Sequence, residues 1–175
     1  MSVSTEDLIV RRSGDLIRVI APRLHFITGK PLQRLRDGAV VPFDFQLSIA
    51  AGARGNVVER AFERFTVSYD VWEEKFSVVR LRDFRKSPSN LSPNAAESWC
   101  LENILARHSG LPGDRDLWAR LEIRSAEPKE PSSFPYAEPG VSITTLIGIF
   151  SRPPWPAQDH WAFESTAFHL ADLKP

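Results

Sequence analysis

The sequence predicts a mainly β domain, an antiparallel β-sandwich of about seven to nine strands with one amphipathic helix and two short ones. Along several segments, apolar side chains alternate with polar ones, as in a strand with one buried face. Three other stretches carry helix start and stop signals. The length of 175 residues suits one ordinary domain, so we expect residues 1–175 to form a single unit.

The segment Phe65–Leu81 organises the predicted fold. Apolar residues occupy every second position from Phe65 to Val71, and a second apolar run, Phe76–Leu81, follows. The intervening Trp72–Lys75 is polar enough to turn but lacks a Gly or Asn for positive φ, which favours a type I loop over a two-residue turn. We therefore predict a β-hairpin near the middle of the fold. Its second run changes phase, which indicates a bulge or burial on both faces.

The chain before this hairpin predicts a strand pair, a short helix and a long strand. Ser13–Asp15 is a plausible turn between strands at 8–10 and 16–20. A short helix at about 31–37 follows, with a proline in its first turn and Gly38 just past its end. Alternation over Phe43–Ile49 then predicts a strand with one face in the core and the other in water.

The second half of the chain predicts the amphipathic helix and two further strands. Ser92 is a good N-cap for a helix at about 92–108, closed by Gly110. Alternation at 117–123 predicts a half-buried strand, and residues 160–170 resemble a closing strand. A proline-rich excursion at 126–140 precedes a short helix at about 142–150, where β-branched residues leave a strand as an alternative.

Composition excludes several classes of protein. Formal net charge is zero, so no overall field attracts a nucleic acid, and we expect no nucleic-acid partner. The basic residues Arg80, Arg82, Arg85 and Lys86 are interpreted as a solvated strand end. Apolar runs are too short for a transmembrane segment. The single cysteine, Cys100, is expected to pack as a small hydrophobe.

Familiar catalytic and cofactor signatures are missing, including a glycine-rich phosphate loop, Gly-x-Ser-x-Gly, His-Glu-x-x-His and Cys-x-x-Cys. The four histidines show no metal-ligand spacing. We therefore predict no metal, no cofactor and no identified catalytic residue. Trp118, on the outward row of a strand, and Trp155, in a proline-rich loop, are the candidate binding residues. For Trp118 on its own, packing under a neighbouring loop is the favoured interpretation, and a partner site is the alternative.

Three stretches carry a resemblance to known sequences: residues 64–78, Leu35–Gly38 and Ala95–Leu101. Together they resemble a group of uncharacterised bacterial proteins of unknown function. This resemblance implies an exported, periplasmic or cell-envelope protein whose N-terminal signal has been removed. The polar, acidic N-terminus shows no signal peptide, so a cytoplasmic location is the alternative.

The leading functional hypothesis is a non-enzymatic interaction module, an accessory or structural subunit of a bacterial envelope assembly with another protein as partner. The alternative is a small-molecule or carbohydrate binding domain, or a hydrolase built around His25, His160 or His169. A pocket that holds one of these histidines beside a carboxylate would favour the alternative. A filled interior with an exposed aromatic surface would favour the interaction module. The oligomeric state is not predicted.

Overall fold

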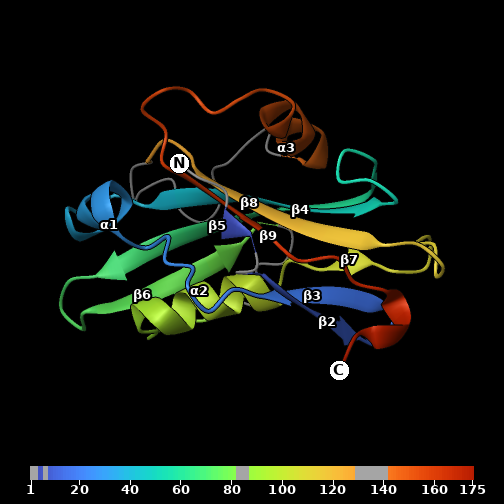
Figure 1. Ribbon diagram of the computed structural model, residues 1–175. Helices are drawn as coiled ribbons and strands as arrows, with labels where there is room; N and C mark the ends of the chain where they lie inside the picture. Colours follow the sequence, from blue (N-terminus) through green and yellow to red (C-terminus); the bar gives the residue numbers. More distant parts are fainter. Residues whose placement is uncertain (1–3, 6–7, 82–86, 129–141) are drawn as a thin grey trace.

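The structure is a computed structural model that describes residues 4–5, 8–81, 87–128 and 142–175, and it confirms the predicted sandwich of two sheets (Figure 1). Apart from the parallel pair β1–β9, the strand pairs are antiparallel. The larger sheet has the order β1 (Ser4–Thr5), β9 (His160–Glu164), β8 (Leu117–Ser125), β4 (Val41–Ala51), β5 (Val57–Asp70), β6 (Lys75–Arg80). The smaller sheet has the order β2 (Ile9–Ser13), β3 (Leu16–Ile20), β7 (Ala106–Arg107).

The predicted hairpin is confirmed as β5–β6, but its predicted place near the middle of the fold is wrong. β6 is the last strand of its sheet, and the central strands are β4 and β8, which pair with neighbours on both sides. The outer edge of β6 is still covered, because Phe76 and Leu91 exchange backbone hydrogen bonds of 2.8 and 2.9 Å. The register to β5 continues without a shift, and both Val78 and Val79 are buried, so the phase change reflects burial on both faces.

The prediction that one face of the Phe43–Ile49 strand lies in water is wrong. Phe43 and Phe45 are buried in the core as expected, yet Asp44 on the opposite face is only 1% exposed. Helix α3 (Ile143–Phe150) covers this face, on the side of the large sheet away from the small sheet (Figure 1). The Asp44 carboxylate is paired with Arg64 on the next strand, and Arg64 Nη2 donates to Asp44 Oδ2 at 2.8 Å. Charge pairing thus allows this face to be buried.

All three helices form where they were expected, with one change of length. Helix α1 spans Gly29–Arg36 and ends before Gly38, whose φ is +97°. Helix α3 begins after Ser142, whose side chain accepts a hydrogen bond from Thr145 N, so the helical alternative for this segment is correct. Helix α2 (Pro93–Glu102) begins after Ser92 as predicted but ends well before residue 108.

The early end of α2 and the short closing strand have tertiary causes. Ala106 and Arg107 leave the helical path to pair with Ile17 and Leu16 of the small sheet, as strand β7. The predicted closing strand at 160–170 likewise stops at Glu164, because the chain then folds back to bridge Leu117 and forms a 3₁₀ turn at Leu170–Asp172.

An aromatic cluster fills the space between the sheets. The ring of Phe26, from the segment between β3 and α1, has its centroid 4.9 Å from that of Phe43 and 5.4 Å from that of Phe45. Trp161 approaches Phe26 at 6.3 Å, with an interplanar angle of 63°. Edge-to-face contacts of this kind are favourable beyond the area they bury. The interior between the sheets is therefore packed with side chains.

Two sequence predictions fall largely outside the described residues. The proline-rich excursion at 126–140 lies within them only at 126–128, and of the basic cluster only Arg80 does. Arg80 Nε donates to Glu63 Oε2 at 2.8 Å, so this arginine is part of an ion pair. Across the described ranges, no helix is long and apolar enough to cross a membrane.

Candidate functional site

The two tryptophans proposed as binding residues lie far apart. Trp118, near the start of β8, is half-buried, and the guanidinium of Arg54 lies 5.9 Å from its ring centroid. Trp118 therefore packs against the β4–β5 loop, which is the interpretation that the sequence favours for this residue. Trp155 is 48% exposed in the segment that returns to Ser125, at the other end of β8. Seven residues of extended chain separate these ends by about 23 Å.

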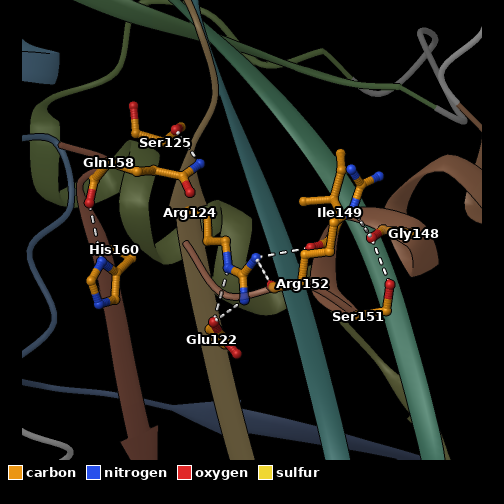
Figure 2. Close-up of polar contacts among 9 residues, drawn as sticks. All are labelled: Glu122, Arg124, Ser125, Gly148, Ile149, Ser151, Arg152, Gln158 and His160. Carbon is orange, nitrogen blue, oxygen red and sulfur yellow. Dashed lines mark hydrogen bonds and ion pairs between the residues drawn. The ribbon is translucent and has the colours of Figure 1, made fainter. Parts of the chain in front are cut away.

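A polar network anchored on Arg124 holds the segment that carries Trp155 (Figure 2). Arg124 Nη1 donates to the carbonyl oxygens of Ile149, at 2.9 Å, and Arg152, at 2.7 Å. Arg124 Nε and Nη2 both donate to Glu122 Oε1. The guanidinium also lies 4.8 Å from the centroid of the Phe150 ring. Arg124 thus fastens the C-terminal end of α3 to β8.

A second set of hydrogen bonds, beside the Arg124 network, fixes the chain after Trp155. Gln158 Nε2 donates to the Ser125 carbonyl at 2.9 Å, and His160 Nδ1 lies 3.1 Å from the Gln158 carbonyl (Figure 2). Because a carbonyl oxygen only accepts, His160 Nδ1 carries the proton. His160 therefore has a structural contact here, and the network as a whole positions a loop.

The most exposed large apolar side chain among the described residues is one that sequence reasoning missed. Trp72, at the tip of the β5–β6 hairpin, is 91% exposed, and its neighbour Val71 is 53% exposed. Charged residues flank Trp72, so the sequence predicts a polar turn at this position. A bulky aromatic residue in a four-residue connection was the available signal, since such a loop cannot bury it locally.

The conformation of this hairpin tip is fixed by Asp70. Its Oδ1 accepts hydrogen bonds from Trp72 N at 2.9 Å and from Glu73 N at 3.1 Å. Such a side-chain turn replaces the backbone bonds that the loop lacks. Glu74 completes the turn with a φ of +53°. The indole is therefore presented from an ordered loop.

A shallow groove of about 480 Å³ runs beside the tip. Tyr69 and Phe76 form one wall, with ring centroids 4.9 Å apart. The remaining lining residues are Arg36, Val71, Glu74 and Pro93. We define the hairpin-tip surface as Val71, Trp72 and this groove.

A second hollow, the His25 cleft, has a volume of about 360 Å³ between α2 and the chain that leaves β3. His25 Nδ1 lies 3.1 Å from Glu97 Oε1, and the side chain of Glu97 is 6% exposed. Glu97 Oε2 also accepts from Phe26 N at 2.6 Å and Ile27 N at 2.9 Å. A histidine thus lies beside a carboxylate in a cleft, which is the feature expected of a small-molecule binding site.

The remaining histidines do not join this cleft. His169 Nε2 lies 2.6 Å from Asp116 Oδ1, with both side chains substantially exposed. His108 Nε2 lies 3.2 Å from the Gly14 carbonyl oxygen. Within the described ranges, no three His, Cys, Asp or Glu side chains gather as a metal site.

Cys100 lies on α2 one turn from Glu97 and is fully buried. Removal of the thiol from water raises its pKa well above the usual value, and the nearby Glu97 charge raises the pKa further. A neutral buried thiol is a poor nucleophile. Cys100 therefore packs as the small hydrophobe that the sequence predicts.

The chain matches no protein-family model, no curated protein and no solved structure.

Proposed function

We propose that this protein is a non-enzymatic interaction module that docks a partner protein through its hairpin-tip surface. The observation that carries the proposal is the 91% exposure of Trp72 on an ordered loop. Tryptophan is among the residues most often found as energetic anchors of protein interfaces. An anchor of this kind needs an ordered base, which the Asp70 hydrogen bonds supply.

The energy available from covering Trp72 is large. An indole buries roughly 150–250 Å². At about 25 cal/mol per Å², that area corresponds to roughly 4–6 kcal/mol before the costs of association are subtracted. Val71 and the Tyr69–Phe76 wall extend the apolar contact. A partner that seats the indole in a pocket therefore gains enough to offset part of the cost of binding.

Charge around the tip indicates the chemistry of the partner. Residues 70–75 carry three acidic side chains, Asp70, Glu73 and Glu74, and one basic side chain, Lys75. We therefore propose a partner with an apolar socket ringed by lysine or arginine side chains. The same carboxylates disfavour an anionic lipid surface, which attracts basic segments.

A bacterial envelope assembly as the setting for this interaction remains a proposal supported by the sequence resemblance of residues 64–78, 35–38 and 95–101. It is tested by fractionation of cells that express the native gene product from its own locus. Recovery in the periplasm or envelope is the expected outcome. Recovery solely in the cytosol would contradict the envelope location and leave the docking proposal to its own test.

Site-specific crosslinking tests the docking proposal. The photoreactive residue p-benzoylphenylalanine is placed at position 72 of the full chain, and at position 155 as a matched exposed control. In native cells we expect position 72, and not position 155, to crosslink to one protein. The purified pair should then bind more weakly as salt rises, because the proposed rim contacts are ionic.

Two single variants complete the test. Trp72→Ala should weaken binding to the purified partner by at least about 30-fold, which corresponds to an anchor residue of about 2 kcal/mol. Trp155→Ala should leave binding unchanged. Equal losses in both variants, or no crosslink from position 72, would refute docking through the hairpin-tip surface.

A further inference from the structure

The His25 cleft carries an inference that is independent of docking at the hairpin tip. We propose that it binds a small zwitterion with an apolar body, such as a free amino acid with an aliphatic or aromatic side chain. The volume of about 360 Å³ lies in the range of small-ligand sites. The cleft combines two opposite charges, an apolar lining and one rigid wall.

Two opposite charges line the cleft without partners among the described residues. Arg18, half-buried on β3, makes no side-chain hydrogen bond or ion pair within the described part of the chain. Glu102, exposed at the last turn of α2, makes none within it either. Although both side chains face one cleft, they do not pair with each other, so their charged atoms lie more than 4.0 Å apart. A ligand with separated carboxylate and ammonium groups satisfies both.

Arg18 and Glu102 each suit one of the two charged groups that an amino acid carries on its α-carbon. The planar guanidinium of Arg18 matches a carboxylate and donates two parallel hydrogen bonds to it. The Glu102 carboxylate accepts from an ammonium group. Four buried apolar residues also line the cleft, and we call them its floor: Val19, Ala21, Leu24 and Leu101. An aliphatic or aromatic side chain that lies on this floor is removed from water.

Glu97 makes one wall of the cleft rigid. Its carboxylate ties Phe26 N and Ile27 N to α2 and also holds His25 Nδ1. Because the Glu97 carboxylate is occupied by these contacts, we expect the charged groups of the ligand to bind Arg18 and Glu102 instead. A neutral His25 then has its proton on Nδ1, toward Glu97, and its Nε2 is free to accept a hydrogen bond from the ligand. The cleft is thus formed before a ligand enters.

Titration calorimetry of the full chain with L-leucine and L-phenylalanine tests the proposal. We expect saturable binding of at least one of them. Two truncated probes separate the charges: 4-methylpentanoate lacks the ammonium group, and 3-methylbutylamine lacks the carboxylate. Each should bind about tenfold or more weakly than L-leucine, because one charge-assisted hydrogen-bonding group is lost. Absence of binding by both amino acids, or equal binding of the truncated probes, would overturn the proposal.

Charge-removing variants show which residue binds the carboxylate and which binds the ammonium group. Arg18→Gln should weaken amino-acid binding at least about tenfold and abolish any preference for 4-methylpentanoate over the amine, while Glu102→Gln should have the converse selectivity. Arg34→Gln on α1, outside the cleft, is the matched control and should bind as the wild type does. Loss of binding in the control to the same degree would show that the effect is not specific to the cleft. The wild-type probe comparison keeps its meaning if a variant fails to fold.

Discussion

The side chain of Arg124 is 5% exposed and donates hydrogen bonds to Glu122 and to the Ile149 and Arg152 carbonyl oxygens. These carbonyls lie at the end of α3, where a helix leaves its acceptors unpaired. One guanidinium therefore donates to a carboxylate on β8 and to two main-chain carbonyl oxygens at the end of α3. Trp72 shows the opposite case, because its side chain is exposed and its fold contacts are few, so its substitution should affect binding more than stability.

Arg124→Ala is expected to lower the free energy of unfolding by about 3–5 kcal/mol, because it removes a buried guanidinium from its ion pair with Glu122 and from its hydrogen bonds to the Ile149 and Arg152 carbonyl oxygens. Urea denaturation measures this change. Arg120→Ala is the matched control: Arg120 is 38% exposed, and its partner Glu164 keeps a second ion pair with Arg54. The control should cost no more than about 1 kcal/mol. Equal costs for the two variants would show that the network does not hold α3.

Helix α2 contributes to both the hairpin-tip surface and the His25 cleft. Pro93 lines the groove beside the hairpin tip, and Glu97 anchors the His25 cleft. The position of the helix start therefore matters to both surfaces. That start depends on Ser92, whose Oγ accepts from Ala95 N at 3.2 Å and so satisfies one of the open donors of the first turn.

Ser92→Ala should lower the free energy of unfolding by about 1 kcal/mol through loss of this cap. Urea denaturation gives the value, and circular dichroism reports any loss of helix. Ser98→Ala in the same helix is the control, because Ser98 has no capping hydrogen bond within the described residues and alanine has the higher helix propensity. This control should be neutral or slightly stabilising. A Ser98→Ala loss as large as that of Ser92→Ala would refute the capping role.

At the scale of the whole molecule, the two sheets share one aromatic core. Phe26 contacts Phe43 and Phe45 of the large sheet, and it is held at its own backbone by Glu97 of α2. Because α2 also packs on β3 and β6, it connects the two sheets. Opening one layer therefore exposes the core of the other, so we expect the domain to unfold cooperatively.

Because Cys100 is buried in the folded state, its ionisation makes the free energy of unfolding depend on pH. Burial raises its pKa in the folded state, whereas the unfolded thiol has an ordinary pKa of about 8.5. Above about pH 8.5 the unfolded chain loses the proton first, so stability falls as pH rises, by about 1.4 kcal/mol at pH 9.5 relative to pH 7. Urea midpoints measured between pH 7 and pH 9.5 follow this decrease.

Cys100→Ala separates the thiol from the other groups. The variant should be less stable throughout, because a buried side chain is shortened, but it should lose this dependence on pH. In the wild type, a thiol reagent should modify Cys100 only at the rate of unfolding. Persistence of the full pH dependence in Cys100→Ala, or rapid modification of the native protein, would contradict this account.

Several features of the fold were predictable because they depend on neighbours along the chain. Period-two alternation marked β4, β5 and β8, since side chains of a strand alternate between faces whatever packs on them. The helix starts at Ser92 and Ser142 and the end before Gly38 were likewise readable, because capping is a contact within one turn.

The candidate sites were not predictable in the same way. The pair His25–Glu97 joins positions 72 residues apart, and no local pattern indicates that they meet. Trp118 is half-buried and Trp155 is exposed, and they lie at opposite ends of β8, so the two tryptophans do not form one surface. Trp72 has charged neighbours in the sequence, so its exposure was not predicted.

The sequence by itself determined the β5–β6 hairpin, the strands β4 and β8, the places where the helices begin, and that these elements form a layered β domain. The tertiary structure alone decided that β6 lies at an edge, that the second face of β4 is buried under α3, and that α2 stops at Glu102 so that β7 can pair. The physical reason is that local conformation follows from adjacent residues, whereas burial and exposure depend on which distant segment covers a surface.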